Sequence, residues 1–178
     1  MSRVLAIDTS TSRTSVAVID GDTVVFSGYK DGATAHGPSL PALVQEALSI
    51  SEVDEVVVGM GPGPFTGLRV GIAFAQSFAL AREIPVRGVC SLDAIAAQVN
   101  ESDFIVSVDA RRKEVYWARY TNGKRVSEPA VNFPADVTGA PVHADLFPDM
   151  VSLVKLTGNI TEPLYLRRPD AVATADRP

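Results

Sequence analysis

An internal repeat constrains the fold of this chain more than any other feature of its sequence. Two segments, Val4–Val25 and Ile105–Val126, align without a gap at an offset of 101 residues. Each has an apolar run that ends in aspartate, Asp8 or Asp109, followed by a second apolar run and a glycine-bearing turn. Only three aligned positions are identical. The shared order of features therefore favours a duplication over two unrelated hairpins that merely look alike.

The repeated unit predicts an antiparallel hairpin at the start of each of two lobes. Asp20-Gly21 and Asn122-Gly123 are strong hairpin signals between apolar runs. Two lobes whose first strand ends in aspartate indicate the duplicated actin-like (ribonuclease H-like) α/β architecture of actin, heat-shock ATPases and sugar kinases. We expect an N-terminal lobe over residues 1–101 and a shortened C-terminal lobe with a tail over residues 102–178.

Hydrophobic periodicity and turn residues place the remaining elements. Strands are expected at Arg3–Ile7, Ser15–Ile19, Thr23–Phe26, Glu55–Val58, Ile84–Val89, Phe104–Asp109, Glu114–Tyr120, Arg125–Val131 and, last, Val151–Leu156. Helices are expected at Ser39–Ile50, at Thr66–Arg82 and after Ser91, which would cap the third helix. Trp117 lies in the middle of a strand, and we expect it to pack in the core.

The glycine- and proline-rich segment Gly59–Gly71 joins a buried strand to a helix, a position where phosphate-binding loops occur. It matches neither the Walker loop nor the dinucleotide fingerprint. Pro62 and Pro64 lack the N–H donors that an anion would need. The segment is therefore interpreted as a tight crossover that starts a helix, with Thr66 near its cap.

The helix that follows, Thr66–Arg82, is apolar nearly all round. A helix of this kind is buried on every side, either within the molecule or against another chain. We predict that Leu68, Ile72 and Ala75 line a contact with another subunit, while a purely internal core helix is an equal alternative from the pattern alone.

The composition excludes several classes of function. With a net charge of −5 and a sequence pI near 5.0, the chain is not expected to bind nucleic acid alone. Its single cysteine, Cys90, fits a reducing cytoplasm. No apolar run is long enough for a membrane span, so a cytoplasmic location is expected. Arg111-Arg112-Lys113 is a basic run after a strand, and a solvated turn is favoured there over a contact with phosphate or a partner.

The chain resembles the TsaB family, also called YeaZ, in three stretches: MSRVLAIDTSTSRTSVAV, GMGPGPFTGLRVGIAFAQSFA and LYLRRPDA. The likeness covers most of residues 1–126 and the tail Tyr165–Ala171, and the string GPGPFTGLRVG is highly specific. Residues 132–160 are shorter and less patterned than the family leads one to expect, which is why the second lobe is predicted to be shortened.

The resemblance implies a non-catalytic subunit of the bacterial complex that transfers a threonylcarbamoyl group to N6 of adenosine 37 in tRNAs reading codons that begin with adenine. It implies pairing with the metal-bearing TsaD subunit, association with the ATPase TsaE, contact with tRNA only within the complex, and self-pairing through the same surface. The implied partner surface lies on two helices and includes Leu40, Leu43, Leu68, Arg69, Ile72, Ala75 and Gln76. No cofactor is expected on the chain alone, although the resemblance allows ATP or ADP at the shared surface.

The residues themselves favour a chain without catalytic or metal-binding residues. Metal-bearing relatives place two histidines four positions apart on a helix, whereas His36 is followed at that spacing by Leu40. A lone histidine at a helix start is more often a cap or a surface residue. Cys90 has no evident histidine partner, and no serine has a nucleophile-elbow pattern. A glycoprotease-like peptidase therefore finds no support.

The turn after the first strand remains a candidate vestigial nucleotide site, formed by Asp8, Thr9, Ser10 and Ser12. No glycine follows the aspartate closely, so backbone N–H groups cannot easily approach a phosphate. A structural strand end is the favoured interpretation. Two further alternatives stay open: an actin-like ATPase or small-molecule kinase, and a homodimeric interaction protein with a separate role.

Overall fold

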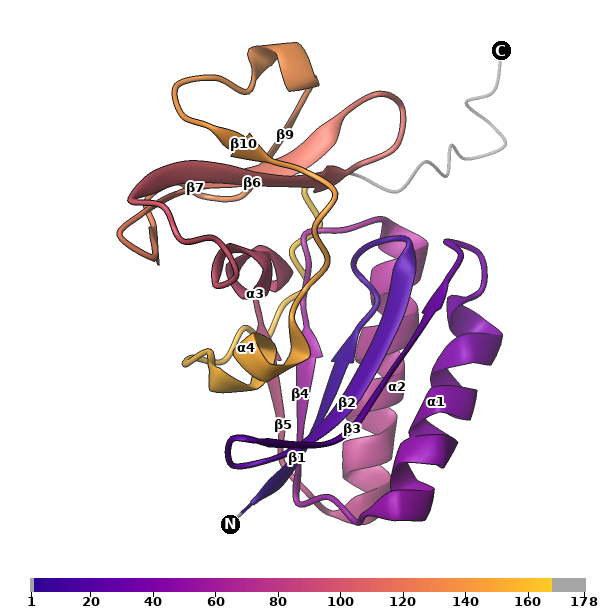
Figure 1. The fold of residues 1–178 in the computed structure, drawn as a ribbon. Coiled ribbons are helices and arrows are strands. Elements are labelled where there is room, and N and C mark those ends of the chain that lie inside the picture. The colour runs from indigo at the N-terminus through magenta and orange to yellow at the C-terminus, as the bar shows by residue number, and fades with distance from the viewer. Residues whose placement is uncertain (1, 168–178) are drawn as a thin grey trace, which may run out of the picture.

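The computed structural model describes residues 2–167 and contains two β-sheets, one in each lobe (Figure 1). The first sheet has the order β3-β2-β1-β4-β5. Its strands are β1 Arg3–Asp8, β2 Arg13–Asp20, β3 Thr23–Asp31, β4 Glu55–Gly59 and β5 Val86–Val89. Strands β1, β2 and β3 pair antiparallel, whereas β4 and β5 continue the sheet in parallel with β1. This order and these directions are those of a ribonuclease H-like lobe, and they confirm the predicted fold class.

Two long helices cover one face of the first sheet, α1 His36–Ile50 and α2 Phe65–Arg82 (Figure 1). Their inward residues and the sheet form the main core cluster. The short helix α4, Met150–Lys155, covers the opposite face, where Leu153 is fully buried. The first lobe is therefore a mixed sheet between helices, as a sheet with two apolar faces requires.

The second lobe is built on the hairpin of β6 Asp103–Asp109 and β7 Val115–Thr121. Short strands extend it: β8 Lys124–Arg125 and β9 Ala130–Asn132 pair with β7, and β10 Val142–His143 pairs with β6. The helix α3, Ser91–Ala96, packs on β6 and β7. A single 3-10 turn, η1 Pro134–Asp136, precedes β10.

The two repeated segments form similar hairpins in the structure, but their structural alignment needs a gap of one residue. Asp8 pairs with Ser15 in the first hairpin, whereas Asp109 pairs with Val115 in the second. The connection in the second hairpin is therefore one residue shorter.

Three local predictions are wrong. The expected last strand is the helix α4, because the Asp149 side chain accepts a hydrogen bond from the Ser152 N–H and caps it. Helix α2 begins at Phe65 with Pro64 in the cap position and has no side-chain cap, so Thr66 lies near the cap, as predicted. In place of the expected strand Arg125–Val131, the structure has β8 and β9, and residues 126–129 between them belong to no strand. Trp117 is half-exposed, with its indole N–H on Asn132, while Tyr116, Ala118 and Tyr120 face the core.

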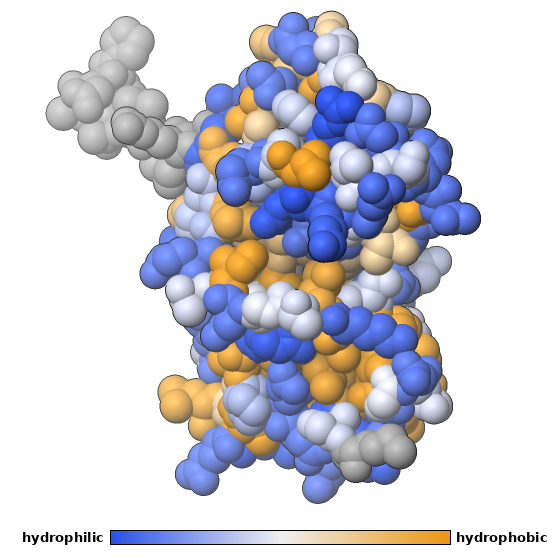
Figure 2. Space-filling model, turned by 90° about the vertical axis from the view of Figure 1, so that its left-hand side faces the viewer, coloured by the Kyte–Doolittle hydropathy of each residue, from blue (hydrophilic) through white to orange (hydrophobic). Residues whose placement is uncertain are grey.

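Side chains gather unevenly on the surface. The side of the molecule that carries α3 and α4 shows hydrophobic residues mainly on the first lobe and near the junction, while the second lobe is largely hydrophilic (Figure 2). Within residues 2–167, no helix is both long and apolar enough to span a bilayer. The part of the predicted tail beyond Arg167 lies outside the described residues.

Candidate functional site

The turn after β1 is the place where an actin-like lobe would hold a phosphate, and here it is closed by hydrogen bonds within the chain. Asp8 Oδ1 accepts bonds from the Ser10 N–H at 2.8 Å and the Ser10 hydroxyl at 2.7 Å. Asp8 Oδ2 accepts a bond from the Ser91 hydroxyl at 2.6 Å. Asp8, Thr9 and Ser10 are each 1% exposed. Both carboxylate oxygens therefore already have partners in the interior.

The glycine-rich segment lies directly on this turn and fills the space above it. A Cβ atom at Gly59 would overlap the Asp8 carboxylate, one at Gly63 would overlap the Ser10 carbonyl, and one at Gly71 would overlap the Thr9 hydroxyl. The Thr9 hydroxyl donates to the carbonyl of Gly67 at 2.7 Å. The glycines thus allow close approach of two parts of the same backbone, rather than approach of a phosphate.

Because of this packing, most of the candidate nucleotide-site residues are buried. Three of its four residues are sealed beneath the glycine-rich segment, and only Ser12 is exposed. Burial raises the pKa of Asp8, although its hydrogen bonds to Ser91 and Ser10 and the nearby His36 oppose that shift. A desolvated carboxyl group with bonds to hydroxyls suits the interior of a protein better than a site for a metal–phosphate complex.

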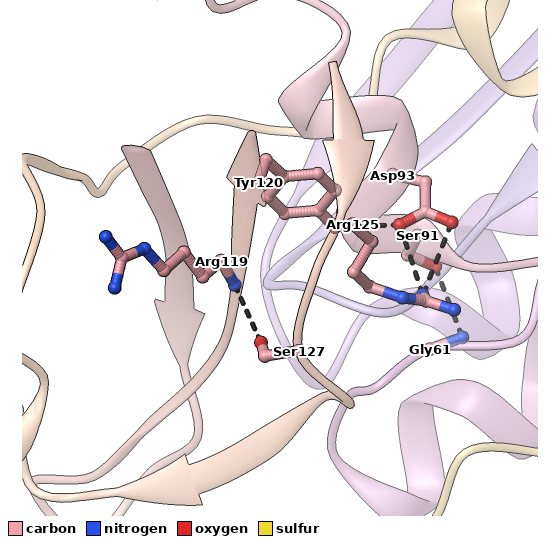
Figure 3. Close-up of polar contacts among 7 residues, drawn as sticks. All are labelled: Gly61, Ser91, Asp93, Arg119, Tyr120, Arg125 and Ser127. Atoms are coloured by element: carbon pink, nitrogen blue, oxygen red, sulfur yellow. Dashed lines mark hydrogen bonds and ion pairs between the residues drawn. The ribbon is translucent and has the colours of Figure 1, made fainter. Parts of the chain in front are cut away.

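Helix α3 connects this turn to the second lobe, a role that the sequence did not reveal. Ser91 does not cap the helix, because Cys90 occupies the cap position. The Ser91 hydroxyl accepts the Gly61 N–H at 3.2 Å (Figure 3). It also donates to Asp8. Two residues later, Asp93 accepts the Tyr120 hydroxyl at 2.7 Å and the Arg125 guanidinium at 3.1 Å (Figure 3). The first turn of one short helix therefore bonds to both lobes.

His36 is a buried structural residue, which corrects its expected role as a cap or surface residue. Its side chain is 4% exposed, and its Nδ1 lies 2.8 Å from the Thr14 hydroxyl. The N-cap of α1 is Ala35. Burial lowers the pKa of His36 and outweighs the opposing effect of Asp8. The lowered pKa favours the neutral imidazole, which lies at the start of α1 against Thr14 of β2.

The residues expected at the partner surface divide into two groups. Five of them fill the core between the helices and the sheet: Leu40, Leu43, Leu68, Ile72 and Ala75 are all at most 5% exposed. They cannot offer their side chains to another chain, so this part of the expectation is corrected. Arg69 and Gln76 are exposed.

Two residues of an exposed stripe on α2, Ala73 and Leu80, were not among the expected partner-surface residues, because the helix looked apolar all round. Arg69, Ala73, Gln76 and Leu80 are exposed, and their spacing puts them on one side of the helix. Leu80 is 82% exposed. The signal in the sequence was the recurrence of Arg69, Ala73 and Gln76, which are polar or small, at intervals of four and three.

Other chemistry-bearing groups are buried or dispersed. Burial raises the pKa of the Cys90 thiol to about 12, so little of it is a nucleophilic thiolate at neutral pH. Among residues 2–167, no three His, Cys, Asp or Glu side chains gather in a way that could hold a metal ion. An open cleft of about 460 Å³ lies between the lobes and is lined by Thr11, Ala33, Thr34, His36, Pro64, Thr66, Gly67 and Arg111.

Comparison with protein families and curated proteins gives a consistent assignment. The family model described as "TsaD: tRNA N6-adenosine threonylcarbamoyltransferase" matches residues 32–168. An uncharacterized protein of Mycobacterium tuberculosis is 44% identical, over 96% of this chain and 94% of its own. The tRNA threonylcarbamoyladenosine biosynthesis protein TsaB of Escherichia coli is 36% identical over 66% of this chain and 54% of its own, so the match spans about half of that relative.

Solved structures show the same likeness. A Pseudomonas aeruginosa protein described as similar to peptidase YEAZ superposes with a TM-score of 0.79 at 27% identity, over 94% of this chain and all of that chain. YeaZ from Pseudomonas aeruginosa gives a TM-score of 0.72 at 28% identity, over 86% of this chain and 89% of its own. The ethanolamine utilization protein EutJ of Carboxydothermus hydrogenoformans, at 14% identity and a TM-score of 0.50 over 72% of this chain and 50% of its own, shares the fold alone.

Proposed function

Because this chain belongs to the TsaB/YeaZ family, we propose that it is a non-catalytic subunit in the biosynthesis of threonylcarbamoyladenosine in tRNA. In this proposal it pairs with TsaD, which carries the metal and transfers the group to N6 of adenosine 37, and TsaE joins them. A role on tRNA would place the chain in the cytoplasm, and any ATP or ADP would bind only at the surface shared with TsaD.

The closed turn after β1 is the observation that carries the non-catalytic role. An actin-like kinase or ATPase needs its first aspartate open to a metal ion and a phosphate, whereas Asp8 is 1% exposed and bonded to Ser10 and Ser91. The same geometry weighs against the ATPase or kinase alternative. The first lobe therefore offers exposed surface, which suits the binding of a partner chain better than catalysis.

The exposed stripe of α2, defined above as Arg69, Ala73, Gln76 and Leu80, is the proposed contact with TsaD. Leu80 offers apolar area that a contact would remove from water. Ala73 is small enough to let another helix approach closely. The buried neighbours Leu68 and Ile72 hold the helix on the sheet and so fix the direction of the stripe.

Reconstitution tests the proposal. TsaD, TsaE, the threonylcarbamoyl donor and unmodified tRNA are combined with and without this chain, and modified nucleoside is measured by mass spectrometry after digestion. The chain alone should give no product, and its addition should raise the yield of the TsaD–TsaE mixture at least tenfold. An equal yield with and without it would refute the role.

A matched pair of variants tests the surface. Leu80→Glu should abolish co-purification with TsaD, whereas Val126→Glu changes a residue in the second lobe that is 58% exposed and should leave co-purification intact. Equal binding by both variants would remove the stripe from the interface while leaving the role itself testable by reconstitution.

A further inference from the structure

The first sheet ends in an open edge at β3. Among residues 2–167, β2 is the one strand that pairs with β3. A strand directs its backbone N–H and C=O groups to both sides, so the groups on the outer side of β3 have no strand partner. None of them forms a backbone hydrogen bond to a turn or loop within the described part of the chain. A row of unpaired backbone groups is a template for another strand.

The two ends of β3 carry features that limit pairing, but its middle does not. A β-bulge lies at one end, where the register shifts between Val18 and Ile19 of β2. Lys30 and Asp31 place charges at the other end. Bulges, charges and proline are the usual protection of an edge strand. Residues 26–29 have neither proline nor charge, so they stay open to a strand from another chain.

A groove runs beside this edge, on the face of the first sheet that α4 covers (Figure 1). Its volume is about 410 Å³, and β2 and β3 form one side while residues 145–151 form the other. We call it the β3 groove. Two apolar side chains of β3 line it, Val24 at 48% and Tyr29 at 57% exposure. Covering such side chains removes apolar area from water and stabilises a complex.

The side chain of Arg13 connects the two sides of the β3 groove. Its guanidinium carbon lies 3.8 Å from the ring centre of Tyr29 and 3.9 Å from that of Phe147. Its Nε also donates to Asp31 at 2.8 Å. Cation–π contacts and an ion pair thus hold both sides in place before anything binds. A preformed groove loses little conformational entropy on binding.

The charges that line the β3 groove are acidic in excess. The charged lining residues are Arg13, Asp145 and Asp149. Arg13 is paired with Asp31, and Asp149 caps α4 through Oδ2. Asp145 is exposed, and its carboxylate has no hydrogen bond or ion pair within the part of the chain that the structure describes. A cationic group in the groove would therefore find an unpaired carboxylate.

The nearby lysines do not neutralise this carboxylate. Lys30 lies opposite Thr14, whose hydroxyl contacts His36 of α1, so Lys30 faces the other side of the sheet. Lys155 lies 2.8 Å from Asp22 and is paired with it.

We propose that the β3 groove binds an extended segment of a partner protein that carries both apolar and basic side chains. The segment adds a strand to the edge of β3, its apolar side chains cover Val24 and Tyr29, and a lysine or arginine reaches Asp145. Backbone hydrogen bonds supply affinity in this mode, and alternate side chains supply specificity. The inference does not depend on the proposed function, because α2 and its exposed stripe belong to the opposite face of the sheet (Figure 1).

Charge complementarity favours such a segment over a second copy of this chain. Antiparallel pairing of two β3 strands would present Val24 and Tyr29 of the second copy to the groove. Lys30 of that copy would again face the other side of the sheet. A second copy would thus supply apolar area and leave Asp145 without a cation.

The test measures binding of a fluorescent nine-residue peptide, Lys-Thr-Val-Thr-Val-Thr-Val-Thr-Lys, to the full chain by anisotropy. The peptide is as long as β3, and its valines and lysines share one face when it is extended. A lysine at each end allows either direction of pairing to bring one to Asp145. Binding should saturate below about 1 mM, and amide hydrogen exchange of β3, measured by NMR, should slow in the complex.

Two control peptides separate charge from strand addition. A twin with glutamate in place of lysine should bind roughly tenfold more weakly. A twin with every backbone nitrogen methylated cannot pair as a strand and should not bind. Absence of saturable binding by the lysine peptide, or equal binding of all three peptides, would overturn the inference.

Matched variants locate the contact. Asp145→Asn should weaken binding of the lysine peptide about threefold, and Val24→Ser should weaken it by about the same factor. The controls Asp136→Asn and Val126→Ser change an exposed carboxylate and an exposed apolar residue of the second lobe and should leave binding unchanged. Equal affinity in all four variants would remove the peptide from the β3 groove and refute the proposal.

Two further outcomes would assign the edge to another occupant and so overturn the inference. The first is a dimer in sedimentation equilibrium whose formation slows exchange of the β3 amides, which assigns the edge to a second copy. The second is protection of the β3 amides in the free full chain that is lost when residues 168–178 are removed, which assigns the edge to this chain's own C-terminal residues.

Discussion

At the scale of single residues, Asp8 shows how a position typical of catalysis can become part of the interior. It stands at the end of β1, where a related ATPase would bind its metal ion, yet Ser10 and Ser91 occupy both of its carboxylate oxygens. Its environment raises its pKa chiefly by removing water. The carboxyl group is therefore more stable in the neutral form in the folded chain than in the unfolded chain.

The first prediction concerns the pH dependence of stability. A raised pKa in the folded state means that the contribution of Asp8 is fully present below its unfolded pKa and is lost as pH rises through the folded value. The asparagine in Asp8→Asn cannot ionise. The free energy of unfolding of this variant should therefore increase relative to that of the parent as pH rises from about 4 to 8. Urea denaturation at each pH measures this difference.

Asp22 supplies a control of opposite sign. It is exposed, and its hydrogen bond and charge interaction with Lys155 lower its pKa. Its contribution is present above the unfolded pKa and is lost as pH falls through the folded value. The free energy of unfolding of Asp22→Asn should therefore increase relative to that of the parent only as pH falls. If the stability of both variants, relative to the parent, changed in the same direction with pH, the raised pKa assigned to Asp8 would be contradicted.

Single residues also show where a sequence is ambiguous. The burial of His36 depends on Thr14, which lies on a different element and reaches it only after folding. Trp117 has the hydropathy of a core residue, but alternation along β7 puts Tyr116 and Ala118 inward and Trp117 on the other face. A one-residue change of register exchanges the two faces of a strand, and hydropathy alone did not resolve it.

At the scale of elements, the glycines of α2 and its preceding loop are explained by contact rather than by flexibility. A Cβ atom at Gly71 would overlap the hydroxyl of the buried Thr9, whereas one at Gly37, in the first turn of α1, would meet nothing within 4 Å. Both glycines lie in helices, where alanine is intrinsically favoured. Substitution by alanine at Gly37 therefore tests helix propensity alone, whereas at Gly71 it also tests packing against Thr9.

The second prediction uses this pair. Gly71→Ala should lower the free energy of unfolding by about 1–3 kcal/mol, because Thr9 and the helix must move apart. Gly37→Ala should raise it by up to about 1 kcal/mol through propensity. Chemical denaturation measures both changes. Stabilisation by Gly71→Ala would show that α2 does not press on the turn after β1.

Elements with strong periodicity were predictable, whereas the short helix α4 was not. The strands β1, β2, β4 and β6 and the helices α1 and α2 follow from apolar runs, helical spacing and turn residues. Helix α4 has only six residues, too few for its period to be distinguished from a strand, and its cap at Asp149 follows a proline-rich stretch. The exposed stripe of α2 was hidden by alanines that suit both a core and a contact.

At the scale of the whole molecule, the duplication predicted two lobes but not how they are joined. Helix α3 bonds to the first lobe through Ser91 and to the second through Asp93. The chain then returns from α4 along β5, where the Ile160 N–H bonds to the Gly88 carbonyl. These contacts join segments that are far apart in the sequence, and no local pattern encodes them. They should make the two lobes unfold together.

The third prediction tests that coupling through Asp93. Asp93→Asn keeps the shape of the side chain but weakens its bonds to Tyr120 and to the half-buried Arg125, at a cost of about 1–3 kcal/mol. Hydrogen exchange followed by mass spectrometry should then show β6 and β7 opening at lower free energy than β1 and β4, whereas the parent protects both sheets alike.

The control for this prediction lies within the second sheet. Asp103→Asn breaks a similar aspartate–arginine pair, in which Arg119 Nη2 lies 2.6 Å from Asp103, but both partners belong to the β6–β7 hairpin. It should weaken the second lobe without separating its opening from that of the first, because α3 still bonds to both. If Asp93→Asn and Asp103→Asn leave the two sheets equally coupled, the lobes are joined by apolar packing rather than by the polar contacts of α3. The coupling would then be expected to persist in any variant that keeps the junction between the lobes apolar.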